Sequence, residues 1–388
     1  MAKNKHPRKM VSLFAGIGGF ELAFRSINVK TTLMCEIDPI AQHVLQTQLP
    51  EVPIIDDVCS MKALPKGTDI LCAGFPCQDL SSVGAKAGLA GTRSSLVKEV
   101  FRLLKTKPVE WVIFENVSFM LSLNKGEAIR TIVEELESLG YNWAYRTIDS
   151  ISFVPQHRCR VFVVASLHND PRDVLLSDSY DATIGKVDFS KFDFPIGFYW
   201  TEGKHALGLI EDGIPTLKAG STIGIASPPA IAFPNGEISI PDICDAERLQ
   251  GFPSNWTQSA EDLTKASIRW RLVGNAVTVD TVAWIANKII KPKAYNSSKD
   301  KELHFTKSKN NWPKAAWGKD GSRFVSMSSK YPTNGHPISL ADFLEHPRKQ
   351  LSLKAAKGFA KRLTEGGMRS PEFFKTALKN HIQLMESK

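Results

Sequence analysis

The stretch VSLFAGIGGFELAF (residues 11–24) decides the fold of this 388-residue chain. It begins as a short apolar run and passes through the glycine turn GIGG (16–19). From Phe20 to Ile27, apolar residues then recur at the i, i+3, i+4, i+7 spacing of an amphipathic helix. The stretch therefore predicts a buried strand, a tight turn and a helix, the opening unit of an α/β sheet.

The same alternation continues to about residue 166. Helical spacing recurs at 97–104 and at 129–136, and again at 279–286. Between the helices lie short apolar runs that we expect to be strands, at 11–14, 32–36, 69–75, 110–117, 145–153 and 160–166. We predict an α/β fold with a doubly wound, mostly parallel sheet, in which ligands bind beyond the carboxyl ends of the strands.

The composition is that of a globular protein with a basic end. Lys and Arg number 49 against 40 Asp and Glu, and residues 291–388 hold 20 of these basic residues and 8 of the acidic ones. This bias favours a polyanionic partner, although ordinary solubilising surface charge explains it equally well. The six cysteines form no CxxC pair, and no apolar run reaches 18 residues. We therefore expect a cytoplasmic protein without a structural metal and without a membrane span.

Polar residues of catalytic type follow several expected strands. Glu36 closes the second strand 20 residues after Gly16, as in sites for nucleoside cofactors, and this spacing alone does not separate NAD from S-adenosylmethionine. Cys77 lies in GFPCQDLSSVG (74–84), where a thiolate could act as a nucleophile, and Glu115 closes the next strand. QHRCR (156–160) adds two arginines. Each feature also has a structural explanation, but together they indicate an active site.

These motifs, in this order, resemble the DNA (cytosine-5)-methyltransferase family of bacterial restriction-modification systems. ERLQGFP (247–253) and GNAV (274–277) look like two late motifs of that family, and GTRSSL (91–96) looks like the segment between its nucleophile and its acid. The resemblance covers about residues 10–290. It implies a Rossmann-like, S-adenosylmethionine-dependent methyltransferase.

The resemblance also implies a catalytic mechanism. Cys77 would add to carbon 6 of cytosine, which makes carbon 5 nucleophilic. Glu115 would supply a proton or hydrogen bond at ring nitrogen 3 and the exocyclic amine. Arg160 would hold the carbonyl oxygen at carbon 2, and Arg158 is the other candidate of the pair. In an alternative assignment, one of these two arginines anchors a phosphate or the nucleophile loop and does not contact the cytosine.

By the same resemblance, S-adenosyl-L-methionine is the cofactor, and Glu36 binds its ribose. Asp57 would reach the adenine amine, and Asn275 would help to fix the methionine end. The expected cofactor-binding residues are Phe14, Gly16, Ile17, Gly18, Gly19, Glu36, Ile37, Asp57, Val58 and Asn275.

Double-stranded DNA is the implied substrate, with the target cytosine rotated out of the stack. Ser82 and Val83 would approach the vacated space, and residues 168–245 would hold the target-recognition region, with PTLKAGSTIG (215–224) as the best single stretch. The expected DNA-binding residues are Ser81, Ser82, Val83, Arg93, Gln156, Lys218 and Thr222.

The domain division that we expect has three parts. Residues 1–166, completed by 266–291, would bind the cofactor and carry catalysis; 167–265 would form a smaller, loop-rich target-recognition domain. Residues 292–388 would be a basic C-terminal extension, either a helical cap packed on the large domain, which we favour, or an added DNA contact. We expect a monomer that works beside a separate restriction endonuclease. An RNA (tRNA) cytosine-5 methyltransferase and a non-catalytic DNA-binding scaffold are the alternatives.

Overall fold

The computed structural model describes residues 8–76, 96–180, 192–201, 208–220, 226, 228–304, 312–334, 338–367 and 370–388. The chain divides into two compact units. The large unit comprises Met1–Asp149, Cys159–Asp181 and Val277–Thr333, and the small unit comprises Ser150–Arg158, Ala182–Ala276 and Asn334–Lys388. These bounds differ from the three-part division expected from the sequence, because both units recruit part of the segment 292–388.

A mixed sheet is the centre of the large unit, and ten strands of the described residues build it in the order β14-β16-β15-β6-β8-β5-β4-β1-β2-β3. The half from β3 to β5 is parallel, and the half from β8 to β14 is antiparallel. The strands are β1 (Lys9–Leu13), β2 (Lys30–Cys35), β3 (Ile54–Ile55), β4 (Ile70–Ala73), β5 (Trp111–Val117), β6 (Asn142–Asp149), β8 (Cys159–Ser166), β14 (Lys301–Glu302), β15 (Ala315–Lys319) and β16 (Ser322–Val325).

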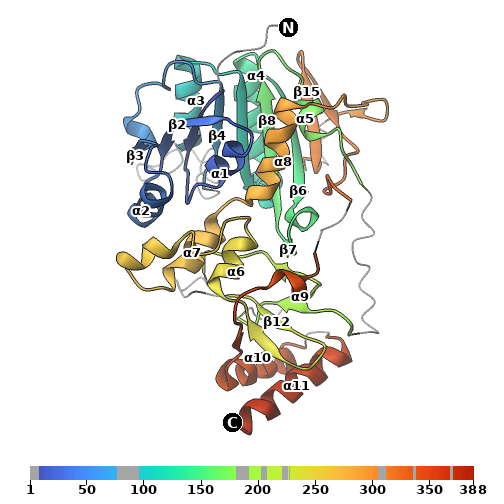
Figure 1. Ribbon diagram of the computed structural model, residues 1–388. Helices are drawn as coiled ribbons and strands as arrows, with labels where there is room; N and C mark the ends of the chain where they lie inside the picture. The colour runs from blue at the N-terminus through green and yellow to red at the C-terminus, as the bar shows by residue number, and fades with distance from the viewer. Residues whose placement is uncertain are drawn as a thin grey trace. The chain divides into compact units, whose positions relative to one another are not determined.

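Helices cover both faces of this sheet, which confirms the doubly wound class. Figure 1 shows α8 (Val279–Ile290) crossing in front of the strands, and α1 (Gly19–Arg25) packs against it. Residues of α3 (Leu96–Thr106) and α4 (Glu127–Ser138) share a core with alternate residues of β1, β4, β5, β6 and β8. All four residues of β4 are buried, as expected of a strand covered on both sides. Two further helices of this unit are α2 (Pro39–Gln48) and α5 (Pro171–Leu175).

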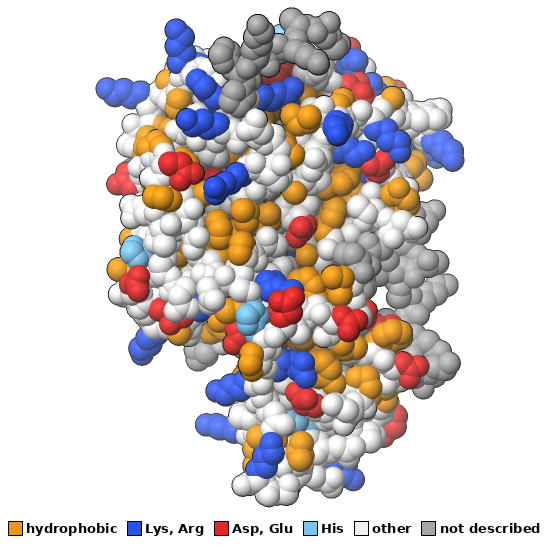
Figure 2. All heavy atoms as spheres, viewed as in Figure 1, with side chains coloured by type: hydrophobic (Ala, Val, Ile, Leu, Met, Phe, Trp, Pro, Cys, Tyr) orange, Lys and Arg blue, Asp and Glu red, His pale blue; other side chains and the backbone are white. Residues whose placement is uncertain are grey.

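Part of the C-terminal segment extends the large sheet instead of forming a helical cap on it. β15 pairs with β6 in antiparallel register, and Arg323 forms an ion pair with Glu137 of α4. The fully buried Arg146 donates hydrogen bonds to the carbonyl oxygens of Ser329, Leu175 and Asp178. On the face shown in Figure 2, basic side chains gather over the part of the large unit that carries β15. The basic residues of the C-terminal segment are shared between the two units, because residues up to Thr333 belong to the large unit and Asn334–Lys388 belong to the small one.

The small unit contains a five-stranded antiparallel sheet, β10-β9-β12-β13-β17, and a short parallel pair, β11-β7. Its strands are β7 (Gln156–His157), β9 (Ile196–Phe198), β10 (Ile210–Glu211), β11 (Ile214–Pro215), β12 (Ala230–Ala232), β13 (Ile238–Ile240) and β17 (Lys349–Gln350). Its helices are α6 (Ile243–Arg248), α7 (Ile268–Asn275), α9 (Leu340–Phe343), α10 (Leu353–Glu365) and α11 (Glu372–Glu386).

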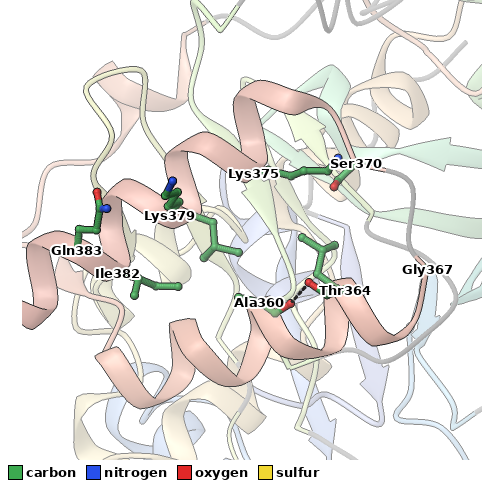
Figure 3. A pocket seen from close by; sticks show the side chains of 10 residues that line it. Ala360, Thr364, Gly367, Ser370, Lys375, Lys379, Ile382 and Gln383 are labelled. Carbon is green, nitrogen blue, oxygen red and sulfur yellow. Dashed lines mark hydrogen bonds between the residues drawn. The ribbon is translucent and has the colours of Figure 1, made fainter.

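The last two helices are an integral part of the small unit. Phe359 and Leu363 of α10 and Phe374 of α11 share a core with Phe198 of β9. The cap favoured from the sequence therefore packs on this unit, where Leu340 and Phe343 belong to a second core. A hollow of about 800 Å³ lies between α10 and α11, with Lys379 at its edge (Figure 3). Within the described part of the chain, no helix combines the length and apolar character that a membrane span requires.

Candidate active site

The glycine turn between β1 and α1 has the backbone conformation that its sequence predicted. Gly16 and Gly18 have φ angles of 58° and 91°, and Phe14 also has a positive φ, 57°. A Cβ atom added to Gly16 would meet no atom of the described residues within 4 Å, so these residues leave the space beside it open. Ile17, Gly18 and Gly19 are buried. The turn therefore combines a strained main chain with room for a ligand to approach it.

Glu36 is joined to this turn across the sheet. Its Oε2 atom accepts a hydrogen bond from the Gly16 N–H at 2.7 Å, and its Oε1 atom accepts one from the Asp38 N–H at 2.9 Å. Burial raises the pKa of the Glu36 carboxyl, while these two N–H groups favour its charged form. The carboxylate thus stabilises the turn and remains partly accessible beside it.

The expected adenine-binding residues differ in exposure. Ile37 is 72% exposed, an unusual position for a large apolar side chain. Asp57 is half-buried, and its Oδ1 atom accepts a hydrogen bond from the Cys59 N–H at 2.8 Å. Val58, expected to flank the ring, is instead buried in the main core, 3% exposed. Ile37 therefore offers an apolar surface, whereas the Val58 side chain serves packing.

The nucleophile candidate Cys77 lies outside the described residues, as do Ser81, Ser82, Val83 and Arg93. The chain is described up to Pro76, and Asn116 holds this end of the strand because its Nδ2 atom donates to the Phe75 carbonyl at 2.9 Å. A Cβ atom on Gly74 would lie 3.5 Å from Glu115 Oε2. The strand end that leads to Cys77 therefore runs directly beside Glu115.

Glu115 and Arg160 form an ion pair on neighbouring strands. Arg160 Nε lies 3.1 Å from Glu115 Oε1, and the two side chains are 14% and 13% exposed, respectively. Arg160 also donates to the carbonyl oxygen of Cys159 at 2.9 Å. The glycine turn, Glu36, Glu115 and Arg160 all belong to the large unit, at the carboxyl ends of β1, β2 and β5 and the start of β8. This end of the sheet is where doubly wound folds bind their ligands.

A buried acid beside the glycine turn was missed from the sequence. Glu21, in the first turn of α1, is 1% exposed, and burial raises the pKa of its carboxyl to about 7. The helical spacing of Phe20, Ala23 and Phe24 defines one apolar face of the helix, and Glu21 is not part of that pattern. However, α8 packs against α1, so the helix is covered on more than its sheet-facing side. Pattern analysis of one segment carries no signal for such a second contact.

Gln156 and Arg158 belong to the small unit and are buried, 0% and 3% exposed. Gln156 accepts from the Leu217 N–H at 2.9 Å and donates to the Leu249 carbonyl at 2.7 Å, which is contrary to the expected contact with DNA. Arg158 donates to the carbonyl oxygens of Leu217, Gly274 and Ala276. These two side chains therefore join three separate sequence motifs, PTLK, RLQG and GNAV, through their main chains.

The remaining expected residues lie at the surface of the small unit or outside the described chain. The Lys218 ammonium lies 4.3 Å from the centre of the Tyr199 ring, and burial lowers its pKa. Asn275 is exposed at the end of α7. Thr222 lies outside the described residues. Lys218 therefore remains a DNA-contact candidate whose position is held by an aromatic ring.

A cluster of metal-ligating residue types occurs in the small unit, where donor atoms of Asp242, Cys244 and His346 lie within 4.8 Å of one another. The cluster is already linked by hydrogen bonds within the protein. Cys244 donates to Asn255 Oδ1 at 3.1 Å, and Asp242 accepts from the Cys244 N–H at 2.8 Å. Arg269 also places a guanidinium nitrogen 3.8 Å from the sulfur, a cation that opposes metal binding there.

Comparison with known proteins agrees with this geometry. The family described as C-5 cytosine-specific DNA methylase matches residues 8–202. Type II methyltransferase M2.BsuMI of Bacillus subtilis (strain 168) is 44% identical over 369 residues, which cover 91% of this chain and 92% of the relative. Type II methyltransferase M.MspI of Moraxella sp is 29% identical over 305 residues, 72% of this chain and 70% of the relative.

Solved structures support the same fold. The Entamoeba histolytica methyltransferase EhMeth has a TM-score of 0.56 at 17% identity, over 74% of this chain and 99% of that one. At this identity the likeness shows the fold alone, and the family assignment depends on the sequence matches. The chain therefore belongs to the C-5 cytosine-specific DNA methylases and is a DNA (cytosine-5)-methyltransferase.

Proposed function

We propose that this enzyme methylates carbon 5 of a cytosine rotated out of double-stranded DNA, through a covalent adduct with Cys77. The observation that carries the proposal is the Glu115–Arg160 ion pair beside the strand end that leads to Cys77. A carboxylate and a guanidinium on one face match the polar edge of cytosine, with its ring nitrogen, amine and carbonyl. The same face lies near the glycine turn.

The Cys77 thiolate adds to carbon 6 of the ring, and the electron pair of the carbon 5–carbon 6 double bond moves toward carbon 5. Glu115, in its protonated form, donates a hydrogen bond or its proton to ring nitrogen 3 and so offsets the negative charge that develops on the ring, while its other oxygen accepts from the exocyclic amine. Arg160 donates to the carbonyl oxygen at carbon 2 and holds Glu115 in place. Carbon 5 would then take the methyl group, with the donor sulfur keeping the bonding electron pair as a thioether. Carbon 5 gives its proton to water, the double bond re-forms as the thiolate leaves carbon 6, and ring nitrogen 3 returns its proton to Glu115.

S-adenosylmethionine supplies the methyl group, as an electrophilic carbon on a sulfonium. The residues of the large unit fit such a molecule: the open space at Gly16 admits it to the main chain, Glu36 offers carboxylate oxygens to ribose hydroxyls, and the exposed Ile37 offers an apolar face to adenine. Asp57 has the acceptor chemistry to bind the adenine amine. The other residues expected from the sequence to bind it are Phe14, Ile17, Gly18, Gly19 and Val58, together with Asn275 of the small unit.

Arg158 has a positioning role in this proposal, because its guanidinium nitrogens are directed at main-chain carbonyl oxygens of the small unit. The biological role that we propose is modification of host DNA beside a separate restriction endonuclease. It rests on the Type II methyltransferases to which the chain is similar. Residues 215–220, held by Gln156 and Arg158, then belong to the surface that faces DNA.

Covalent trapping tests the proposal. A pool of mixed-sequence duplexes in which 5-fluorocytosine replaces cytosine should give a stable adduct with the intact protein and S-adenosylmethionine, because fluorine at carbon 5 cannot leave as a proton does. Cys77→Ala should give no adduct. Cys59→Ala, which removes an exposed cysteine, is the matched control and should still form it. If the intact protein traps none of these duplexes but does trap tRNA in which 5-fluorocytosine replaces cytosine, the proposal that duplex DNA is the substrate is overturned.

A further inference from the structure

A second, smaller hollow of the small unit has the chemistry of an anion site. Its volume is about 300 Å³, roughly ten times the volume of one water molecule in the liquid, which is ample for a phosphate group. Eight residues line it: Ala219, Gly220, Ala226, Thr264, Lys265, Ser267, Ile268 and Arg271. None of them has a role in the proposed chemistry, although Ala219 and Gly220 belong to the segment 215–220 that faces DNA in the proposal above.

Among the described residues, the ionisable side chains of the lining are both basic, Lys265 and Arg271, and none is acidic. Lys265 is exposed and Arg271 is half-buried, so one cation reaches into solvent and the other is held by the fold. Thr264 and Ser267 add hydroxyl groups, which donate hydrogen bonds to phosphate oxygens as readily as to any acceptor. A negatively charged group with several oxygen atoms could accept hydrogen bonds from these two cations and two hydroxyl groups together.

The first turn of α7 contributes to the lining of the hollow through Ser267 and Ile268. Ser267 occupies the position before the helix, and its side chain makes no capping hydrogen bond. Two N–H groups of this turn already have acceptors, because the Ile268 N–H donates to the Lys265 carbonyl and the Arg269 N–H donates to the Ala266 carbonyl. The positive end of the helix dipole still adds to the potential of the two cationic side chains around the hollow, a combination that favours an anion.

The lining also includes Ala219 and Gly220, within the stretch expected to recognise DNA. This stretch packs closely on α7: a Cβ atom on Gly274 would lie 2.2 Å from the carbonyl carbon of Lys218. Because the main chain of α7 packs against that of residues 215–220, an anion bound in the hollow would fix the position of residues 215–220 relative to that anion.

We propose that this hollow binds one phosphate of the DNA backbone, through Lys265, Arg271 and the hydroxyl groups of Thr264 and Ser267, and so positions residues 215–220 on the duplex. The inference rests on the duplex-DNA substrate proposed above and adds an anchoring site to it. Phosphate contacts of this kind fix the register of a protein on DNA without reading its sequence.

The salt dependence of DNA binding tests the site. Affinity for a mixed-sequence duplex, measured by fluorescence anisotropy across a range of NaCl concentrations, gives a slope of log K against log salt. That slope shrinks by about 0.9 for each DNA phosphate that the protein no longer neutralises. Lys265→Gln and Arg271→Gln should each reduce the slope by up to that amount. The double variant should reduce it by about 0.9 in total, since both residues serve one phosphate.

Lys379→Gln is the matched control, because it removes one positive charge from the same unit at the α10–α11 hollow (Figure 3). Its slope should equal that of the intact protein. Lys265→Glu, at an exposed and readily mutated position, provides a variant that folds even if Arg271→Gln does not. Unchanged slopes in the Lys265 variants, or an equal reduction in Lys379→Gln, would overturn the site. If the intact protein traps 5-fluorocytosine DNA while these slopes stay unchanged, only this inference fails.

Discussion

Arg160 and Glu115 form an ion pair although the strand register does not place them opposite each other: Glu115 lies across from Phe162, and Arg160 lies across from Val117. They are diagonal neighbours on one face of the antiparallel β5–β8 pair, which is a distance that long side chains span. The acid at the end of β5 thus meets the arginine at the start of β8. The reversal of strand direction at this point of the sheet creates the polar pair.

Replacing Glu115 should separate catalysis from binding. Glu115→Gln keeps the shape but cannot deliver a proton, so single-turnover methyl transfer should fall by about 10²- to 10⁴-fold, while duplex affinity stays near that of the intact protein. Arg160→Lys should also be slow, because a lysine cannot bind Glu115 and the Cys159 carbonyl with one planar group. Rapid-quench assays with tritiated donor provide the rates. A Glu115→Gln enzyme of normal rate would contradict the assigned role.

Removal of the Glu36 carboxylate should weaken donor binding. Glu36→Ala leaves the part-buried N–H groups of Gly16 and Asp38 without their acceptor, at a cost of up to about 1–3 kcal/mol for each. We expect the Kd for S-adenosylmethionine to rise at least about tenfold in titration calorimetry. Asp56→Asn, an exposed acid nearby, is the control and should bind normally. Equal affinities for Glu36→Ala and the control would disprove the contact.

The buried Glu21 should make stability depend on pH. Burial raises the pKa of its carboxyl from 4.5 to about 7, so the folded protein holds this proton more tightly than the unfolded chain. The free energy of unfolding should therefore fall by about 3 kcal/mol between pH 4.5 and pH 7 from this group. Below pH 4.5 the group is neutral in both states and contributes no further change.

Glu21→Gln removes this titration. Its urea midpoint should exceed that of the intact protein increasingly as the pH rises from 5 to 7, and the difference should level off above pH 7. Glu372→Gln, at an exposed position in the first turn of α11, is the control and should show no such trend. A midpoint difference for Glu21→Gln that is the same at every pH would exclude a raised pKa.

Two glycine substitutions should have opposite effects. Gly274→Ala forces a Cβ atom against the main chain of Lys218 and Ala219, an overpacking that costs about 1–3 kcal/mol or more. In α10, a Cβ atom on Gly358 would lie 3.6 Å from its nearest neighbour, a guanidinium nitrogen of Arg362, which is an ordinary contact. Gly358→Ala should therefore stabilise the helix by up to about 1 kcal/mol. Thermal unfolding should give a lower midpoint for the first variant and a higher one for the second. Duplex affinity should fall only in Gly274→Ala.

The local signals along the chain were enough to predict the α/β sheet, the glycine turn and the residues at the strand ends. Each depends on neighbours in sequence: an apolar run that becomes a strand, a spacing of three and four that becomes a helix, and glycines where the main chain turns through positive φ. The order of the motifs was likewise sufficient to indicate the methyltransferase family, because motif identity does not require coordinates.

Only the tertiary structure decided which side chains meet. It buried Gln156 and directed Arg158 at main-chain carbonyls, and it covered Glu21 with a helix from residues 279–290. It also divided the C-terminal segment between a strand beside β6 and helices of the small unit. The physical reason is that burial depends on elements packing from distant parts of the chain, whereas periodicity records only the face that one element turns toward its own core.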